Sequence, residues 1–292
     1  MSLPLIAPLL FVCLGLAAGA LLSSKTRPSV AVRVLTTSIV AATTGAAAAV
    51  LLVALAAASE LRAVSDALGW CRALYPGDHG AGPWAGLIAA TLLAVAAWRA
   101  LVQDERWRHD ASAFGRVDGV RVVPMAGAIA YAVPGRHGGI VLGDQLLRSL
   151  DAEERRVVLA HERAHLDLHH HRYLRTAEAC AAALPLLRPL ARRIRFETER
   201  WADEAAAANL GSRLPVARTI AKVALLGRAE NRPLLAFGGG QVMARVDAMV
   251  NPPTTTPLIA FALATATIVG TATGSWVQLH HLAEFVIHAC GS

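Results

Sequence analysis

Two histidines and a glutamate near the middle of the chain have the types and spacing needed to hold a metal ion and activate water. The segment His161–His165 has the sequence His-Glu-Arg-Ala-His. On a helix, positions four apart share one face, so both imidazoles can reach one cation. Glu162 can take a proton from an attacking water without binding the metal, as in zinc-dependent peptide hydrolysis. The alternative is a solvated His-rich helix end, because His169–His171 follow closely.

A third metal ligand is expected downstream, where two carboxylates again stand four residues apart. Glu199 and Asp203 lie on a segment predicted to be helical, so they share one face. One of them can bind the metal while the other orients a ligating histidine through a hydrogen bond. Glu197 is a rival ligand, but the residue four positions later is Trp201 and not a carboxylate. The alternative interpretation is an acidic helix face exposed to solvent.

Short β-like runs and helix-start signals precede the histidine pair and are expected to position it. Gly and Pro residues separate the β-like runs, as they do at turns. Asp151 is a candidate N-cap of the helix that carries both histidines, because acidic residues follow it in the first turn. The sequence therefore predicts strands at Gly119–Val123, Ala128–Val133 and Gly139–Leu142, a short helix at Asp144–Ser149, and a longer helix at Glu154–His165.

The composition indicates a membrane protein. Apolar residues make up 55% of the 292 residues and charged residues 17%, whereas soluble domains average about 25% charged residues. Four uncharged stretches are long enough to cross a bilayer. The alternative is a set of Ala-rich helices buried in a soluble core. The predicted spans are residues 3–22, 34–59, 80–98 and 254–277.

The distribution of charge sets the expected orientation of these spans. Basic residues follow the first and third spans, so the positive-inside rule places the segment after each of them in the cytoplasm. The predicted organisation is three spans within residues 1–101, a cytoplasmic domain at 102–253, and a fourth span with a short outer tail at 254–292. Cys71 and Cys290 then share the outer side, where a disulfide can form.

Several of these motifs together resemble the BlaR/MecR-type integral membrane zinc metallopeptidases, which are relatives of the HtpX and CAAX-prenyl-protease gluzincins. The resemblance implies an α-helical membrane protein with about four transmembrane helices and an α+β zincin-like (gluzincin) cytoplasmic peptidase domain. It also implies a multi-pass location in the bacterial inner (plasma) membrane. The segments that carry it are Ala128–Gly135, Ile140–Leu142, Leu150–Glu154, His161–His165 and Glu199–Asp203.

The resemblance also assigns roles to the candidate site residues. It implies one Zn²⁺ per chain, bound by His161, His165 and Glu199. Glu162 would be the catalytic base, and Asp203 would orient a metal ligand without binding the metal itself. Residues 177–190 are too short to span a bilayer, and the family suggests that they dip toward the membrane.

Three further expectations concern residues around this set. Arg245 is a candidate for oxyanion stabilisation, because related peptidases carry an arginine there; its alternative is a cation flanking the membrane. His137 and His169–His171 are expected to be solvated. A substrate peptide in extended conformation is expected to add as a strand to an edge formed within Gly119–Val133.

The substrate class remains open between several expectations. The resemblance suggests a regulatory role, in which the enzyme cleaves a cytoplasmic transcriptional repressor or itself. An HtpX-like quality-control protease and a non-catalytic membrane scaffold are the alternatives. No Ser-x-x-Lys motif follows the fourth span, so the extracellular penicillin-sensor domain of BlaR/MecR proteins is expected to be missing. The net charge of +7 is attributed to topology and anionic lipid, and no direct nucleic-acid partner is expected because no helix-turn-helix motif is evident.

Overall fold

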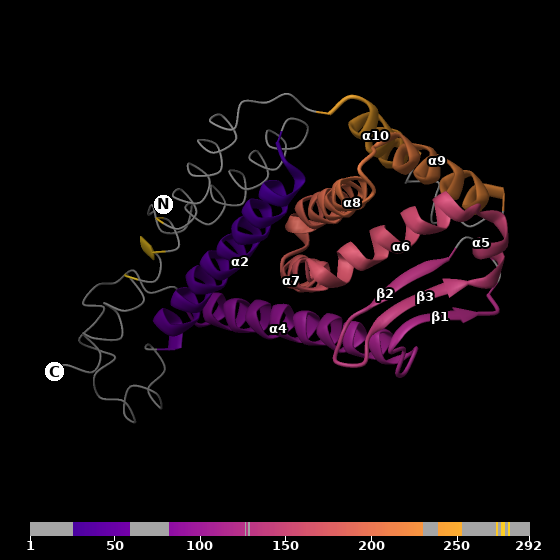
Figure 1. The fold of residues 1–292 in the computed structure, drawn as a ribbon. Helices are drawn as coiled ribbons and strands as arrows, with labels where there is room; N and C mark the ends of the chain where they lie inside the picture. The colour runs from indigo at the N-terminus through magenta and orange to yellow at the C-terminus, as the bar shows by residue number, and fades with distance from the viewer. Residues whose placement is uncertain are drawn as a thin grey trace.

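The computed structural model describes residues 26–58, 82–125, 127, 129–229 and 239–252, with residues 273, 276, 277 and 280 near the C-terminus. The span predicted at 3–22, most of the span at 254–277, and the cysteines of the Cys71–Cys290 pair lie outside the described residues. Figure 1 shows the elements: α2 (Pro28–Ala58), α4 (Gly82–Ser112), β1 (Gly119–Val123), β2 (Ala130–Val133), β3 (Gly139–Gly143), α5 (Asp144–Ser149), α6 (Ala152–Asp167), α7 (His170–Ala183), the 3-10 turn η2 (Pro185–Leu187), α8 (Arg188–Leu210), α9 (Leu214–Ala229) and α10 (Gly239–Val250).

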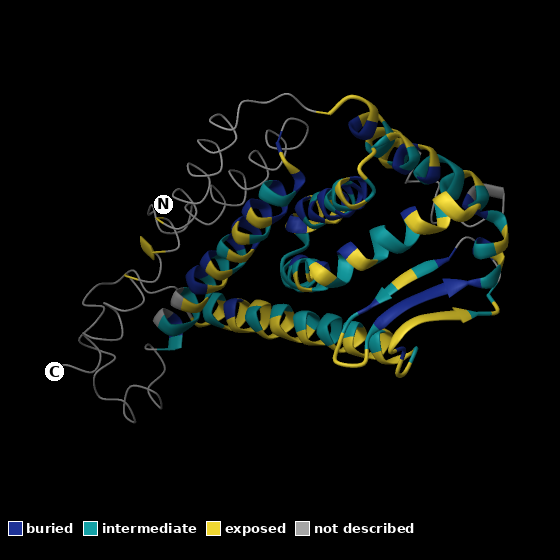
Figure 2. Ribbon diagram, in the orientation of Figure 1, coloured by how far each residue is buried: buried dark blue, intermediate teal, exposed yellow. Residues whose placement is uncertain are grey.

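The three predicted strands form one small mixed sheet in the order β1-β3-β2. β3 runs parallel to β1 and antiparallel to β2. All five residues of β3 are buried, whereas β1 is largely exposed (Figure 2). β1 has the predicted bounds, and β3 ends one residue later than predicted; β2 begins at Ala130, two residues after the predicted start. Because β2 is an edge strand, one side of its backbone is open for pairing.

Helix α6 lies between the sheet and the helices α8 and α9 (Figure 1). The prediction that Asp151 caps this helix is confirmed. Its carboxylate accepts a hydrogen bond from the Glu154 backbone N–H at 2.9 Å, and the Glu154 carboxylate accepts one from the Asp151 N–H at 2.8 Å. Such a capping box fixes the first turn. The histidine pair therefore stands on a helix whose start is set locally and whose two sides are covered.

Helices α2 and α4 are long and apolar enough to cross a membrane, by length and composition. The qualifying stretches are Pro28–Leu55 and Pro83–Ser112, which overlap the second and third predicted spans. The two helices pack against each other. A Cβ atom placed on Gly86 would lie 2.3 Å from the Ala57 Cβ, so the backbones approach as closely as glycine allows.

Both helices also contact the part of the chain that carries the histidines. The buried face of α2 packs against Ala177, Leu187, Leu190 and Ile194, so the segment predicted to dip toward the membrane forms the end of α7, η2 and the start of α8. The last turns of α4 pack against α7. α4 continues to Ser112, and the predicted boundary between residues 101 and 102 falls inside it. One continuous helix therefore links the third predicted span to β1.

Candidate metal centre

Helices α6 and α8 bring two imidazoles and one carboxylate to a common point. The Nε2 atoms of His161 and His165 lie 3.1 Å apart. The Glu199 carboxylate oxygens lie 3.5 Å from the His161 Nε2 and 3.6 Å from the His165 Nε2. A tetrahedral zinc site with bonds of about 2.0–2.1 Å has ligand–ligand edges of about 3.3–3.4 Å. Of the described residues, this trio is the cluster of three whose donor atoms could share one metal ion.

The side chains behind this trio hold it in place. The Asp203 Oδ1 lies 3.0 Å from the His161 Nδ1, and Asp203 is almost fully buried. The Arg245 Nε and Nη2 donate to the two Asp203 oxygens at 2.7 and 2.8 Å, while its Nη1 lies 3.2 Å from the Glu199 Oε2. A carboxylate on Nδ1 fixes the tautomer in which Nε2 is free for a metal. Asp203 and Arg245 therefore orient both His161 and Glu199.

His170 supports the second histidine in the same way. Its Nδ1 lies 3.1 Å from the His165 Nδ1, and its ring packs 4.9 Å from the Trp201 ring. His170 is fully buried, and burial lowers its pKa to about 3, so it is neutral. If the His165 Nε2 is to bind a metal, its Nδ1 must carry the proton. The neutral His170 is positioned to accept that proton in a hydrogen bond.

Glu162 lies in a cavity of about 200 Å³ next to the trio. Burial raises the pKa of its carboxyl to about 7, although the neighbouring His161 and a backbone hydrogen bond from Ala132 on β2 act in the opposite direction. A group with a pKa in this range can both take and give a proton near neutral pH. The rest of the cavity is largely apolar and includes Leu146, Val157, Val158, Val216, Ile220 and Val223.

The charges around the cavity fit a divalent cation. Glu162, Glu199 and Asp203 face one arginine, Arg245, which leaves a formal charge of −2 when the histidines are counted as neutral, the form in which Nε2 can bind a metal. Burial opposes ionisation, but the hydrogen bond from His161 and the charge of Arg245 hold the pKa of Glu199 well below its usual value. Burial likewise opposes the charge on His161, and its hydrogen bonds with Asp203 and Glu199 raise its pKa to about 10. The donor set and the excess negative charge thus both suit Zn²⁺.

The structure brings together six of the residues proposed from the sequence for this site, which are His161, Glu162, His165, Glu199, Asp203 and Arg245. The helix face that carries the two carboxylates packs against α6, where Asp203 is buried and Glu199 is half-buried. Glu197 lies elsewhere, buried against Arg193 and Arg200. Arg245 lines the cavity and pairs with Asp203.

The expectation that the whole run His169–His171 is solvated is wrong for His170, whose side chain is buried because α7 packs against α8. His169 is exposed, as is His137, which pairs with Asp118. The 4-residue spacing rule could not have found His170, because it stands five positions after His165 and on another helix.

Comparisons with known proteins identify part of this region. No curated protein and no solved structure matches the chain. The model of peptidase family M48 matches residues 109–183, which include β1, β2, β3 and the two histidines on α6 but end before Glu199. The matched quarter of the chain supports a metallopeptidase of this family. The third candidate ligand, Glu199, lies outside the match and rests on the sequence pattern and the geometry.

Proposed function

We propose that the protein is an integral membrane zinc endopeptidase that cleaves extended protein segments close to the membrane surface. The observation that carries the proposal is the convergence of His161, His165 and Glu199 at tetrahedral ligand spacing beside Glu162. The match to peptidase family M48 over the segment that holds both histidines supports it. The complete set also favours an active enzyme over the non-catalytic scaffold considered from the sequence.

His161, His165 and Glu199 would hold the zinc ion. A bound zinc ion supplies Lewis-acid activation of the scissile carbonyl and of water. Glu162 takes a proton from the attacking water and returns it to the nitrogen of the leaving amine. Asp203 and His170 keep the two imidazoles in the tautomer that leaves Nε2 free. We assign Arg245 to orienting Glu199 and Asp203, because all three of its nitrogens already face their carboxylates.

The edge strand β2 is the proposed binding site for substrate backbone. The Ile129 carbonyl accepts a hydrogen bond from the Gly143 N–H, so the backbone N–H and C=O groups of odd-numbered residues here point toward β3. Backbone groups alternate in direction along a strand, and Ala130 and Ala132 therefore face the open side. Ala132 bonds to Glu162, and Ala130 lines the cavity. A substrate strand paired there would pass the site, and the apolar cavity would take one apolar side chain beside the scissile bond.

The proposed membrane location rests on α2 and α4. Trp84, Leu87, Ile88, Leu92, Val95 and Trp98 of α4 are exposed although they are apolar. At the other side of the pair, the Arg33 guanidinium lies 5.5 Å from the centre of the Trp201 ring on α8. The start of α2 and the end of α4 thus contact the same catalytic region, as expected for a hairpin that leaves the cytoplasm and returns.

The proposal also includes a regulatory role for the enzyme. The resemblance to BlaR/MecR-type peptidases favours a cytoplasmic repressor, or the chain itself, as substrate, and membrane protein quality control is the alternative. A trapping experiment separates them. The full chain carrying Glu162→Gln is expected to retain zinc, lose proteolysis and accumulate its substrate, which mass spectrometry then identifies as a repressor, the chain itself or a set of misfolded membrane proteins.

The matched control is Glu153→Gln, which removes the same charge from an exposed position on the same helix. Cleavage by this control is expected to equal that of the wild type. Proteolysis that survives Glu162→Gln with zinc still bound would overturn the assignment of Glu162 and, with it, the mechanism.

A further inference from the structure

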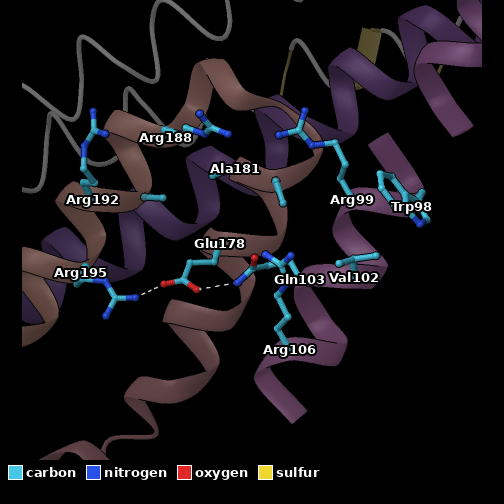
Figure 3. A pocket seen from close by; sticks show the side chains of 12 residues that line it. Trp98, Arg99, Val102, Gln103, Arg106, Glu178, Ala181, Arg188, Arg192 and Arg195 are labelled. Carbon is cyan, nitrogen blue, oxygen red and sulfur yellow. Dashed lines mark hydrogen bonds and ion pairs between the residues drawn. The ribbon is translucent and has the colours of Figure 1, made fainter. Parts of the chain in front are cut away.

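A cavity of about 540 Å³ lies between α4, α7 and α8, away from the metal centre, and its lining is strongly basic (Figure 3). One carboxylate, Glu178, also lines it, which leaves a formal charge of +4. The basic side chains come from two helices and converge on one space, which distinguishes this cavity from a solvated basic helix face. They are Arg99 and Arg106 of α4 and Arg188, Arg192 and Arg195 of α8.

Glu178 does not neutralise the remaining positive charge of the cavity, because both of its carboxylate oxygens already have partners. The Glu178 Oε2 accepts hydrogen bonds from the Gln103 amide at 3.1 Å and the Trp107 indole N–H at 2.7 Å. Its Oε1 pairs with Arg195. In the part of the chain that the structure describes, no carboxylate pairs with the other four arginines. Figure 3 shows Arg99 and Arg188 extending toward each other across the cavity, an arrangement that an anion between them would stabilise.

The position of the cavity along α4 indicates where such an anion would come from. Trp98, near the end of the exposed apolar face of α4, lines the cavity, and Arg99 directly follows it. Tryptophan at the end of a span marks the level of lipid headgroups. A basic pocket between helices at the cytoplasmic side of a membrane is suited to an anionic headgroup, and guanidinium groups bind phosphate oxygens in pairs.

We propose that this cavity binds the phosphate headgroup of an anionic phospholipid. The proposal rests on the membrane placement proposed above but not on the peptidase chemistry. It has a consequence for that chemistry, since Arg188, Arg192 and Arg195 lie on the first turns of the helix that carries Glu199. A lipid bound there would fix the membrane-proximal end of α8 relative to α4.

The test measures lipid bound to the full chain in neutral detergent by native mass spectrometry. The chain is titrated with phosphatidylglycerol and, separately, with phosphatidylcholine. One equivalent of phosphatidylglycerol is expected to bind preferentially, and Arg188→Gln with Arg192→Gln is expected to weaken it on the order of tenfold or more. The control pair Arg172→Gln and Arg218→Gln removes the same charge from exposed positions outside the cavity and is expected to bind as the wild type does.

The variant Arg188→Lys with Arg192→Lys guards against misfolding, because it keeps the charge and is expected to retain part of the affinity. Equal binding of the two lipids by the wild type, or wild-type affinity in the glutamine pair, would overturn the proposal. Inorganic phosphate and glycerol phosphate form a third arm. Displacement of the lipid by either at equal concentration would assign the cavity to a soluble phosphate and refute the lipid. Neither zinc nor proteolysis enters this readout, so its failure is distinct from failure of the proposed function.

Discussion

Two helix pairs in this molecule make their contacts by opposite means. Between α6 and α8, polar side chains pair with one another, as His161 does with Asp203, and Arg245 of α10 in turn pairs with Asp203. Between α2 and α4 the backbones approach through small residues such as Ala57 and Gly86. Removing a charge between α6 and α8 leaves another buried charge without its partner. The contact between α2 and α4 is instead sensitive to the volume of the side chains at the interface. Metal binding should therefore depend on the first pair and be independent of the second.

The largest effect is expected from Glu199→Gln. The amide keeps the shape of the side chain but removes the charge of the proposed third ligand, and zinc affinity should fall by more than about 100-fold, beyond the range typical of outer-shell partners. Competition with a fluorescent chelator measures this affinity. Glu204→Gln, on the same helix but paired with Arg213, is the control and should bind zinc like the wild type. A Glu199 variant with unchanged affinity would remove Glu199 from the ligand set.

Asp203→Asn is expected to weaken zinc binding by about 10- to 100-fold. The amide can no longer give His161 a charged acceptor, and the Arg245 guanidinium loses its closest counter-charge. The same chelator competition applies. If affinity does not change, the contact between Asp203 and His161 plays no part in holding the metal.

His170→Asn is expected to lower zinc affinity by about tenfold, at the weaker end of outer-shell effects. The change removes the acceptor that faces the His165 Nδ1 and leaves space beside Trp201. His169→Asn is the matched control: His169 is exposed and has a positive φ of 55°, which asparagine tolerates. Equal affinities in the two variants would show that His170 only fills space.

The smallest effect is expected from Gly86→Leu, which should leave zinc affinity unchanged. The new side chain would meet Ala57 and should destabilise the α2–α4 contact by about 1–3 kcal/mol through overpacking. Unfolding in detergent micelles measures this cost, with Ala90→Leu at an exposed position of the same helix as control. Zinc affinity that fell with stability would show that the two helix pairs are coupled.

The same contrast explains what could be predicted from sequence. The strands, the capping by Asp151 and the helix that carries His161 depend on local spacing, and their bounds were predicted within a few residues. The segment that carries Glu199 was predicted to be helical, but without bounds. The apolar character of α2 and α4 likewise follows from composition. The continuation of α4 to Ser112 was not predicted, because its last turns are charged and are held by packing against α7.

The candidate site could be predicted where its residues follow helical spacing and not where they depend on tertiary packing. His170 differs from its exposed neighbour His169 through the packing of α7 against α8, and a run of three histidines carries no sign of it. The engagement of Arg245 with Asp203 joins residues 42 positions apart. The choice of β2 over β1, the other edge of the sheet, required the tertiary contacts of β2, because Ala132 bonds to Glu162 and Ala130 lines the cavity.

The most direct measurement is the zinc content of the purified full chain and of its His161→Ala variant, determined by elemental analysis after removal of loosely bound metal. The convergence of His161, His165 and Glu199 predicts one tightly bound zinc per wild-type chain and its loss from the variant. A wild-type chain without tightly bound zinc, or a variant that keeps it, would contradict the metal centre on which the proposed peptidase function depends.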